Sequence, residues 1–211
     1  MNSADLFTGE LVRLTAEDPE TVAKPYSEWA RDTEFSRYLD SNPPYTFSAK
    51  KWKEWMEKDM EKDNNHFFSI RTLDGDQFIG FVALFELHWQ HGDTMVAIAL
   101  GPREYWGKGY GTEAMNLMLR YAFTELNLRR VSLIVFEYNQ RGVRSYEKNG
   151  FVVEGRIRGA MLREGKRWDF VWMGVMREDW LKLQNLSLRG GTPPKQSPQS
   201  TAAHSDLRFA E

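Results

Sequence analysis

Three glycines at alternate positions, Gly107, Gly109 and Gly111, separate an apolar run from a helical pattern, and no other segment constrains the fold as strongly. The apolar run at 95–100 suits a strand, whereas residues 110–125 have the apolar spacing of a helix. Backbone amides at a helix N-terminus bind anions, and a loop without Cβ atoms lets the anion approach closely. The sequence therefore predicts a strand, an anion-binding loop and a helix in succession.

The patterns before and after this loop differ in how they connect strands. Upstream, strand-like runs follow one another through short turns, and downstream strands alternate with helices. This order predicts an α/β (α+β) fold with a mixed sheet of about seven strands flanked by helices. The expected elements are a strand at 10–14, helices at 25–39 and 48–60, strands at 67–73, 78–89 and 95–100, a helix at 110–125, a strand at 130–136, a helix at 139–148 and two strands around 164–166.

The second of these helices has an apolar face. Ser48 suits its N-cap, and Trp52, Trp55, Met56 and Met60 recur at three- and four-residue spacing. A stripe of this kind is typical of a core contact, so we expect these four side chains to be buried.

The length of 211 residues suits one domain and a tail. From residue 184 onward the sequence loses apolar periodicity and gains Pro, Ser and Gly. We therefore expect a single domain over residues 1–183 and a disordered tail over residues 184–211.

Composition excludes several kinds of site. Lys and Arg number 28 against 30 Asp and Glu, so no net basic field attracts nucleic acid or an acidic membrane. The absence of cysteine excludes thiolate metal sites and an acyl-cysteine intermediate. Neither a signal-peptide pattern nor an apolar run of about 18 residues is present, so we expect a cytoplasmic protein without membrane or nucleic-acid partners.

Two familiar phosphate loops fit the glycines poorly. A Walker loop needs Ser or Thr after its Gly-Lys pair, but Gly109 follows Lys108 here. Gly109, Gly111 and Ala114 satisfy the dinucleotide pattern G-x-G-x-x-A, yet five residues from Pro102 to Trp106 intervene after the strand and its glycine, and the acidic ribose ligand is absent. This second interpretation stays as an alternative to a pyrophosphate-binding loop at the start of the helix.

Residues 101–114 resemble the acetyl-CoA loop of the GNAT N-acetyltransferases, whose pattern is Arg/Gln-x-x-Gly-x-Gly/Ala. Within that superfamily they are most similar to the branch of ribosomal-protein and spermidine N-acetyltransferases, and residues 38–45, 139–151 and 158–180 agree. The resemblance spans about residues 8–181. It implies a bent GNAT-like sheet, acetyl-CoA as acetyl-donor cosubstrate, an amine as acceptor and a homodimer as one assembly.

The same resemblance implies that acetyl-CoA binds along the end of the strand, the glycine loop and the start of a later helix. The implied cofactor-binding residues are Ile98, Ala99, Leu100, Trp106, Gly107, Lys108, Gly109, Tyr110, Gly111, Thr112 and Asn139. Trp106 departs from the family pattern, which has Arg or Gln there; because backbone amides bind the phosphates, we expect this change to weaken binding little. Asn139 also suits the N-cap of its helix.

In this family the amine attacks acetyl-CoA directly in a ternary complex, a route that needs no cysteine. By resemblance Tyr146, two helical turns after Asn139, is the catalytic proton donor to the departing thiolate. Full transfer from a phenol of pKa about 10 to a thiol of pKa about 8.5 is uphill by roughly 2 kcal/mol, so we expect hydrogen-bond donation. A tyrosine that only packs in the core is the alternative.

The general base is the weakest part of the pattern. Relatives often carry Glu on the strand before the loop, and Met95 holds that position here. Glu86 matches another acidic residue of the spermidine enzymes and is our second catalytic candidate, which takes or relays the proton; a merely exposed or ion-paired Glu86 is equally compatible. His88 and His91 lack a third ligand, so we predict no metal.

A poorly equipped base favours an acceptor that is easily deprotonated. At neutral pH, removing a proton costs about 4 kcal/mol for a lysine-like amine and about 1 kcal/mol for an α-amine. We therefore favour a protein or peptide N-terminus over a polyamine or other small amine. A non-catalytic acyl-CoA sensor or interaction module is the alternative function, and four arginines are candidates for contact with an acidic partner: Arg156, Arg158, Arg163 and Arg167.

Overall fold

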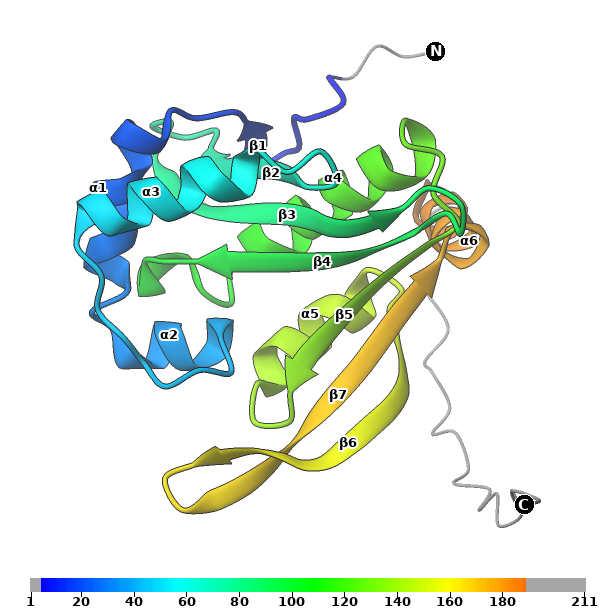
Figure 1. The fold of residues 1–211 in the computed structure, drawn as a ribbon. Coiled ribbons are helices and arrows are strands. Elements are labelled where there is room, and N and C mark those ends of the chain that lie inside the picture. Colours follow the sequence, from blue (N-terminus) through cyan, green and yellow to red (C-terminus); the bar gives the residue numbers. More distant parts are fainter. Residues whose placement is uncertain (1–4, 189–211) are drawn as a thin grey trace.

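The computed structural model describes residues 5–188, which form one seven-stranded sheet with helices on both faces (Figure 1). The strand order is β1-β2-β3-β4-β5-β7-β6, and only the β4–β5 pair is parallel. The predicted mixed sheet of seven strands is therefore confirmed. The strands are β1 (Val12–Thr15), β2 (His66–Thr72), β3 (Phe78–His88), β4 (Asp93–Leu100), β5 (Arg130–Phe136), β6 (Val152–Arg163) and β7 (Lys166–Met176).

Helices divide between the two faces of this sheet. The first three cover one face, the next two cover the other, and the last follows β7 at the edge of the molecule (Figure 1). The helices are α1 (Pro19–Trp29), α2 (Thr33–Leu39), α3 (Ala49–Met60), α4 (Tyr110–Thr124), α5 (Gln140–Lys148) and α6 (Arg177–Leu188), and a short 3-10 helix, η1 (Arg103–Tyr105), precedes the glycine loop.

The predicted helix at 25–39 is wrong in two respects. Asp18 caps α1 by accepting from the Glu20 amide, and Pro19 occupies the first turn, so the helix begins before Pro25 and contains it. Asp32 caps α2 in the same way, which divides the predicted helix in two. Each helix thus begins directly after an Asp N-cap, and these caps, rather than Pro25, determine where the two helices begin.

The predicted tail begins too early at residue 184. Helix α6 extends to Leu188, so residues 184–188 are helical, and Gln184 Nε2 donates to Asn116 Oδ1 on α4 over 3.0 Å. Residues 189–211 lie outside the described residues, and the tail there stays a prediction.

The apolar face of α3 is only partly buried. Ser48 is the N-cap, as predicted, and Met56 is 2% exposed. Trp55 and Met60, however, are 44% and 41% exposed, so the expectation that all four apolar side chains are buried is wrong. The helix packs against α1, with the centroid of the Trp52 ring 4.1 Å from that of Tyr26, and this contact leaves Trp55 and Met60 outside the core.

Strands β4 and β5 pair over a very short distance. Their register holds only from Asp93 with Arg130 to Met95 with Ser132, and beyond it the strands diverge (Figure 1). The Gly101 amide donates to Ile79 on β3, so by the alternation of an extended strand the polar groups of Ile98 and Leu100 face the opening. The Leu100 oxygen accepts from the Trp106 indole N–H over 2.8 Å. The parting of the strands therefore leaves the polar groups of Ile98 and the Leu100 amide without a strand partner along this edge of β4.

Apolar side chains pack on both faces of the sheet. One cluster joins α4 to the strands and includes Met115, Met118 and Phe123, all at most 1% exposed. The other lies under α1–α3 and includes Tyr26 and Phe81. The two clusters hold α4 and α2 on opposite sides of the point where β4 and β5 separate.

A single carboxylate joins the first turn of α4 to the start of the chain. Glu113 accepts from the backbone amides of Glu10, Leu11 and Val12 over 2.7–2.8 Å. Gly9 is required beside it, since a Cβ there would lie 2.4 Å from Glu113 Cδ. These bonds fix β1, and with it the edge of the sheet, to the helix that follows the glycine loop.

We expect Glu113→Gln to lower the free energy of unfolding by about 2–4 kcal/mol, because an amide oxygen cannot replace both charged acceptor atoms. Urea unfolding measures this change. The control is Glu104→Gln on the exposed η1 turn, where we expect a change within about 0.5 kcal/mol. Equal stabilities of the two variants would contradict the anchoring role of Glu113.

Candidate functional site

A cavity of about 420 Å³ opens where β4 and β5 part. The end of β4, the glycine loop, the first turn of α4 and one face of α5 line it, with α2 at one side. Ten of the residues predicted from the sequence line this cavity: Ile98, Ala99, Leu100, Trp106, Gly107, Gly109, Gly111, Thr112, Asn139 and Tyr146.

Three predicted side chains lie elsewhere. Lys108 is exposed to solvent, and Tyr110 packs edge-on against Tyr105 with ring centroids 5.2 Å apart. Glu86 lines a second cavity on the α1–α3 side of the sheet. The loop glycines therefore line the cavity, whereas Lys108 and Tyr110 do not, and cofactor binding by these residues stays a prediction.

The glycine loop has the form of an anion-binding site. Gly109 has φ +98° and is the N-cap of α4, and no side-chain hydrogen bond caps this helix. Gly107 has φ +74°, and a Cβ built on it would have no protein atom within 4 Å. The loop therefore has free amides and open space beside its backbone, which fits the diphosphate of a CoA molecule.

Polar contacts hold α5 close to the start of α4. Thr112 Oγ1 lies 2.8 Å from Ser145 Oγ, and the buried Asn149 donates to the backbone oxygens of Thr112 and Ser145 over 3.1 Å. At the other end of α5, Asn139 caps the helix by accepting from the Gly142 amide over 2.9 Å, and it also lines the cavity. The two helices thus form a fixed wall of the cavity.

Tyr146 is half-buried in this wall and packs against Phe151, with ring centroids 5.9 Å apart. Within residues 5–188 its hydroxyl forms no hydrogen bond, and the hydroxyl oxygen is accessible from the cavity. Loss of hydration raises the pKa of Tyr146 to about 12. The phenol is therefore a neutral hydrogen-bond donor that is available to a ligand in the cavity.

Three basic residues of α5 also line the cavity, and the sequence analysis did not select them. They are Arg141, Arg144 and Lys148. Their spacing of three and four residues along one helix would have indicated a common basic face.

The second cavity, of about 950 Å³, lies on the α1–α3 side of the sheet. Phe35 and Leu39 of α2 line both cavities, so the two spaces adjoin. Aromatic side chains dominate the second cavity: Tyr26, Tyr45, Phe47, Trp52, Trp55, Phe67, Phe81 and Phe85. The exposed Trp55 of α3 is therefore part of a cavity wall rather than of the core.

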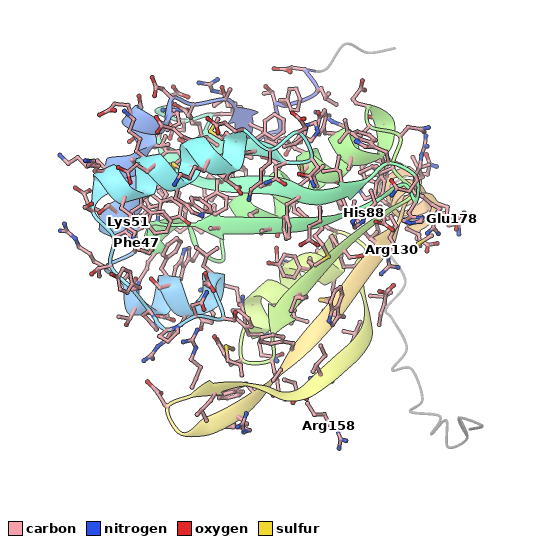
Figure 2. The ribbon with its side chains drawn as sticks, viewed as in Figure 1. Phe47, Lys51, His88, Arg130, Arg158 and Glu178 are labelled. Carbon is pink, nitrogen blue, oxygen red and sulfur yellow. The ribbon has the colours of Figure 1, made fainter. Side chains whose placement is uncertain are left out.

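Charged groups are few in this aromatic cavity. Asp59 and Lys62 form an ion pair over 2.6 Å, and Lys51 Nζ lies 4.5 Å from the centroid of the Phe47 ring (Figure 2). Asp40 and Glu86 also line it. Neither carboxylate forms an ion pair with a basic side chain in the described part of the chain. Asp40 Oδ1 accepts from the backbone and side-chain amides of Asn42 over 2.8 and 3.0 Å, so Glu86 is the more available of the two to a ligand.

The backbone of Glu86 has an uncommon conformation. Its φ is +54°, and it lies where the β3–β4 register is interrupted between Phe85 and His88. A non-glycine residue in this region costs roughly 1–2 kcal/mol, and such residues concentrate at functional sites. Glu86 is exposed to solvent and lies at the rim of the aromatic cavity.

The remaining candidates have structural contacts. Met95 forms the last β4–β5 register pair, which leaves a thioether at the point where the strands part. His88 Nδ1 lies 2.9 Å from Asp93 Oδ1, at the end of the sheet opposite Phe47 (Figure 2). Within residues 5–188 no three His, Asp or Glu side chains are grouped as metal ligands.

The four arginines of the β6–β7 hairpin do not form one surface. Arg163 donates to the backbone oxygens of Asp40 and Asn42 over 2.7 Å, and Arg167 donates to Gly159. Arg156 lies 3.8 Å from Glu137, whereas Arg158 points away from the body of the molecule (Figure 2). These contacts argue against their common role as a site for an acidic partner.

None of the helices within residues 5–188 combines the length and the apolar character that a membrane crossing requires.

Comparison with known proteins identifies the family. Residues 10–152 match the model of the acetyltransferase (GNAT) domain. The SPbeta prophage-derived uncharacterized N-acetyltransferase YokL of Bacillus subtilis is 30% identical over 174 residues, which cover 82% of this chain and 94% of that protein. The spermidine N(1)-acetyltransferase of Escherichia coli is 34% identical over 112 residues, which cover 53% of this chain and 59% of that protein.

A solved structure has the same fold. The spermidine N-acetyltransferase of Vibrio cholerae, crystallised in complex with CoA and spermine, superposes with a TM-score of 0.72 at 25% identity. The match covers 81% of this chain and 98% of that one.

Two glycines provide a matched test of the loop. Gly107 and Gly165 have φ +74° and +75°, and a Cβ at either would meet no protein atom within 4 Å. We expect Gly107→Ala and Gly165→Ala to lose about 1–2 kcal/mol of stability each, whereas only Gly107→Ala weakens CoA binding, by roughly 10-fold or more. Thermal unfolding and calorimetric titration with CoA measure the two effects, and similar CoA affinities would show that Gly107 does not contact the cofactor.

Proposed function

Since this chain belongs to the GNAT acetyltransferase family and transfers an acetyl group from acetyl-CoA to an amine, we propose that its acceptor is a primary amine attached to a large apolar group. The favoured class is the α-amine of a peptide or protein N-terminus with an apolar first side chain. A polyamine, as in the spermidine enzymes, is the second candidate because those relatives share the fold.

One observation carries the proposal: two cavities of different character adjoin at Phe35 and Leu39. The first has the free amides of the glycine loop and the free edge of β4, which suit CoA and its pantetheine arm. The second has aromatic walls, which suit the apolar part of an acceptor. An amine bound in the second cavity approaches a thioester in the first from the opposite side.

The charges of the aromatic cavity favour a single amine over a polycation. Asp59 is already paired with Lys62, and Lys51 adds a positive charge to the wall. A polyamine needs a carboxylate near each of its ammonium groups, whereas Asp40 Oδ1 already accepts from the backbone and side-chain amides of Asn42. Of the carboxylates of this wall, Glu86 is the one that has neither an ion pair nor a hydrogen bond within residues 5–188. The wall is therefore better suited to one ammonium group and a large apolar surface.

The absence of a carboxylate at Met95 favours an amine of low pKa. An α-amine with a pKa near 7.8 loses its proton at a cost of about 1 kcal/mol at neutral pH. Glu86, which lines the acceptor cavity, accepts or relays that proton. It is the second catalytic residue of the proposal.

Acetyl-CoA supplies an activated acyl group and a thiolate as leaving group. The loop amides bind its phosphates, and the polar edge of β4 beyond Met95 orients the pantetheine arm. Tyr146 donates a hydrogen bond to the sulfur as negative charge develops there. A free hydroxyl in the cofactor cavity favours this catalytic role over a core tyrosine, and also favours an enzyme over a non-catalytic sensor; assembly as a homodimer stays a prediction.

We expect Tyr146→Phe to lower kcat by on the order of 10- to 100-fold with little change in CoA affinity, because only the transition state carries charge on sulfur. Because the pKa of Tyr146 is raised to about 12, its donor form persists at every pH below that value. The ratio of wild-type to variant kcat therefore stays constant from pH 7 to pH 10. An unchanged kcat would remove Tyr146 from the mechanism, and a ratio that falls toward one above pH 8.5 would show that its donor form is lost earlier.

Free CoA release with a panel of acceptors tests the acceptor class. We expect kcat/KM to rank peptides with Phe or Leu at the N-terminus above peptides with Gly or Asp, and both above spermidine. Glu86→Gln lowers kcat more for amines of pKa near 10.4 than for α-amines, since the former are more dependent on a base. A faster reaction with spermidine would overturn the proposed acceptor class.

A further inference from the structure

The α5 face of the cofactor cavity is basic and has no acidic counterpart. Arg141, Arg144 and Lys148 line the cavity, and none of them lies within 4 Å of a carboxylate in the described chain. The chain as a whole has more acidic than basic residues, 30 against 28, so three cations without ion-pair partners on one helix are not explained by composition. Their charge is therefore available to an anionic ligand.

Arg141 differs from the other two in that aromatic rings hold its guanidinium. Its Cζ lies 4.1 Å from the centroid of the Trp106 ring and 5.2 Å from that of Tyr38. Trp106 is itself fixed, because its indole N–H donates to the Leu100 oxygen over 2.8 Å. The edge of the Tyr38 ring packs against Trp106 at 6.2 Å and 73°. Arg141 thus extends from the first turn of α5 to the residue that begins the glycine loop.

A second arginine, Arg103, also lies near Trp106, but its charge is not available to a ligand as that of Arg141 is. Arg103 Cζ lies 5.5 Å from the Trp106 centroid, but its guanidinium also binds Asp32 over 2.7 Å and Glu34 over 2.6 Å. These two carboxylates compensate its charge. Arg141 has the aromatic contacts without the carboxylates, so no nearby carboxylate offsets its charge and its N–H donors are free beside the loop.

We propose that Arg141, positioned by stacking on Trp106, binds the diphosphate of CoA together with the amides of the glycine loop. Trp106 adjoins Gly107, whose open side lines the cavity, so the guanidinium and the loop amides face the same space. An arginine suits this role because its planar group forms paired hydrogen bonds to phosphate oxygens. Helix α5 then supplies side-chain N–H donors beside position 106, where the family pattern has Arg or Gln in the loop.

Calorimetric titration of the full chain with CoA and with dephospho-CoA tests the role of Arg141. We expect Arg141→Gln to weaken both ligands by about 10-fold or more and to reduce the salt dependence of binding, because both carry the diphosphate. Arg158→Gln is the control, since this exposed arginine lies on the hairpin outside both cavities. Unchanged affinity overturns the proposal, and so does a loss seen with CoA but absent with dephospho-CoA, which would place Arg141 on the 3′-phosphate.

A double-mutant cycle tests the positioning role of Trp106. If Trp106 presents the guanidinium, Arg141→Gln costs less affinity in the Trp106→Leu background than in the wild type, and Trp106→Phe, which keeps an aromatic face, restores part of the difference. Additive losses would show that the two side chains act independently. Thermal unfolding of each variant confirms that it is folded, and because binding of CoA is measured without an acceptor, the outcome is separate from that of the acceptor panel.

Discussion

The short contact between β4 and β5 is the constraint on which the rest of the site depends. Three register pairs join the strands, and the last of them contains Met95 and Ser132. In a longer ladder the backbone groups of Ile98 and Leu100 would form hydrogen bonds with β5, and the space between the strands would close. The separation is maintained from both sides, since α4 and α5 pack on one face and α2 covers the other (Figure 1). The first cavity therefore depends on this interruption of the sheet, and the aromatic cavity adjoins it at Phe35 and Leu39.

Local signals predicted most of the secondary structure. The strands at β2–β5 and the helices α3–α5 follow from apolar periodicity and from caps such as Ser48 and Asn139, because these signals act within a few residues. The sequence pattern predicts one helix where the structure has α1 and α2, although Asp18 and Asp32 are N-cap signals for two separate helices. Length and composition also indicated one domain, but they did not indicate that α6 continues beyond residue 183, where Gln184 donates to Asn116 of α4.

The site was predictable only in part, for a related reason. The loop glycines and Asn139 lie on contiguous motifs, so resemblance located them, and the structure brings them to one cavity. Phe35 and Leu39, which join the two cavities, belong to a helix that is distant in sequence from the loop. No local pattern indicates such contacts, because they arise from the way the sheet places its helices.

Trp106 illustrates the limit of reading a motif position by position. Trp106 stands where the family pattern has Arg or Gln, yet the guanidinium of Arg141 occupies the neighbouring space from a different helix. The side-chain chemistry near a ligand is set by the groups that reach it in space, whichever element carries them. Relatives with different residues at both positions can therefore preserve one electrostatic environment by paired substitutions.

The β6–β7 hairpin extends this reasoning to the acceptor side. Arg163 holds the backbone oxygens of Asp40 and Asn42, and Glu164 pairs with Arg37 over 2.8 Å, so the tip of the hairpin fixes the segment that walls the aromatic cavity. None of these contacts involves the glycine loop or α5. The fold is in this sense modular. Exchange of the hairpin tip together with residues 40–47, by evolution or by engineering, offers a route to new acceptors while the cofactor cavity stays unchanged.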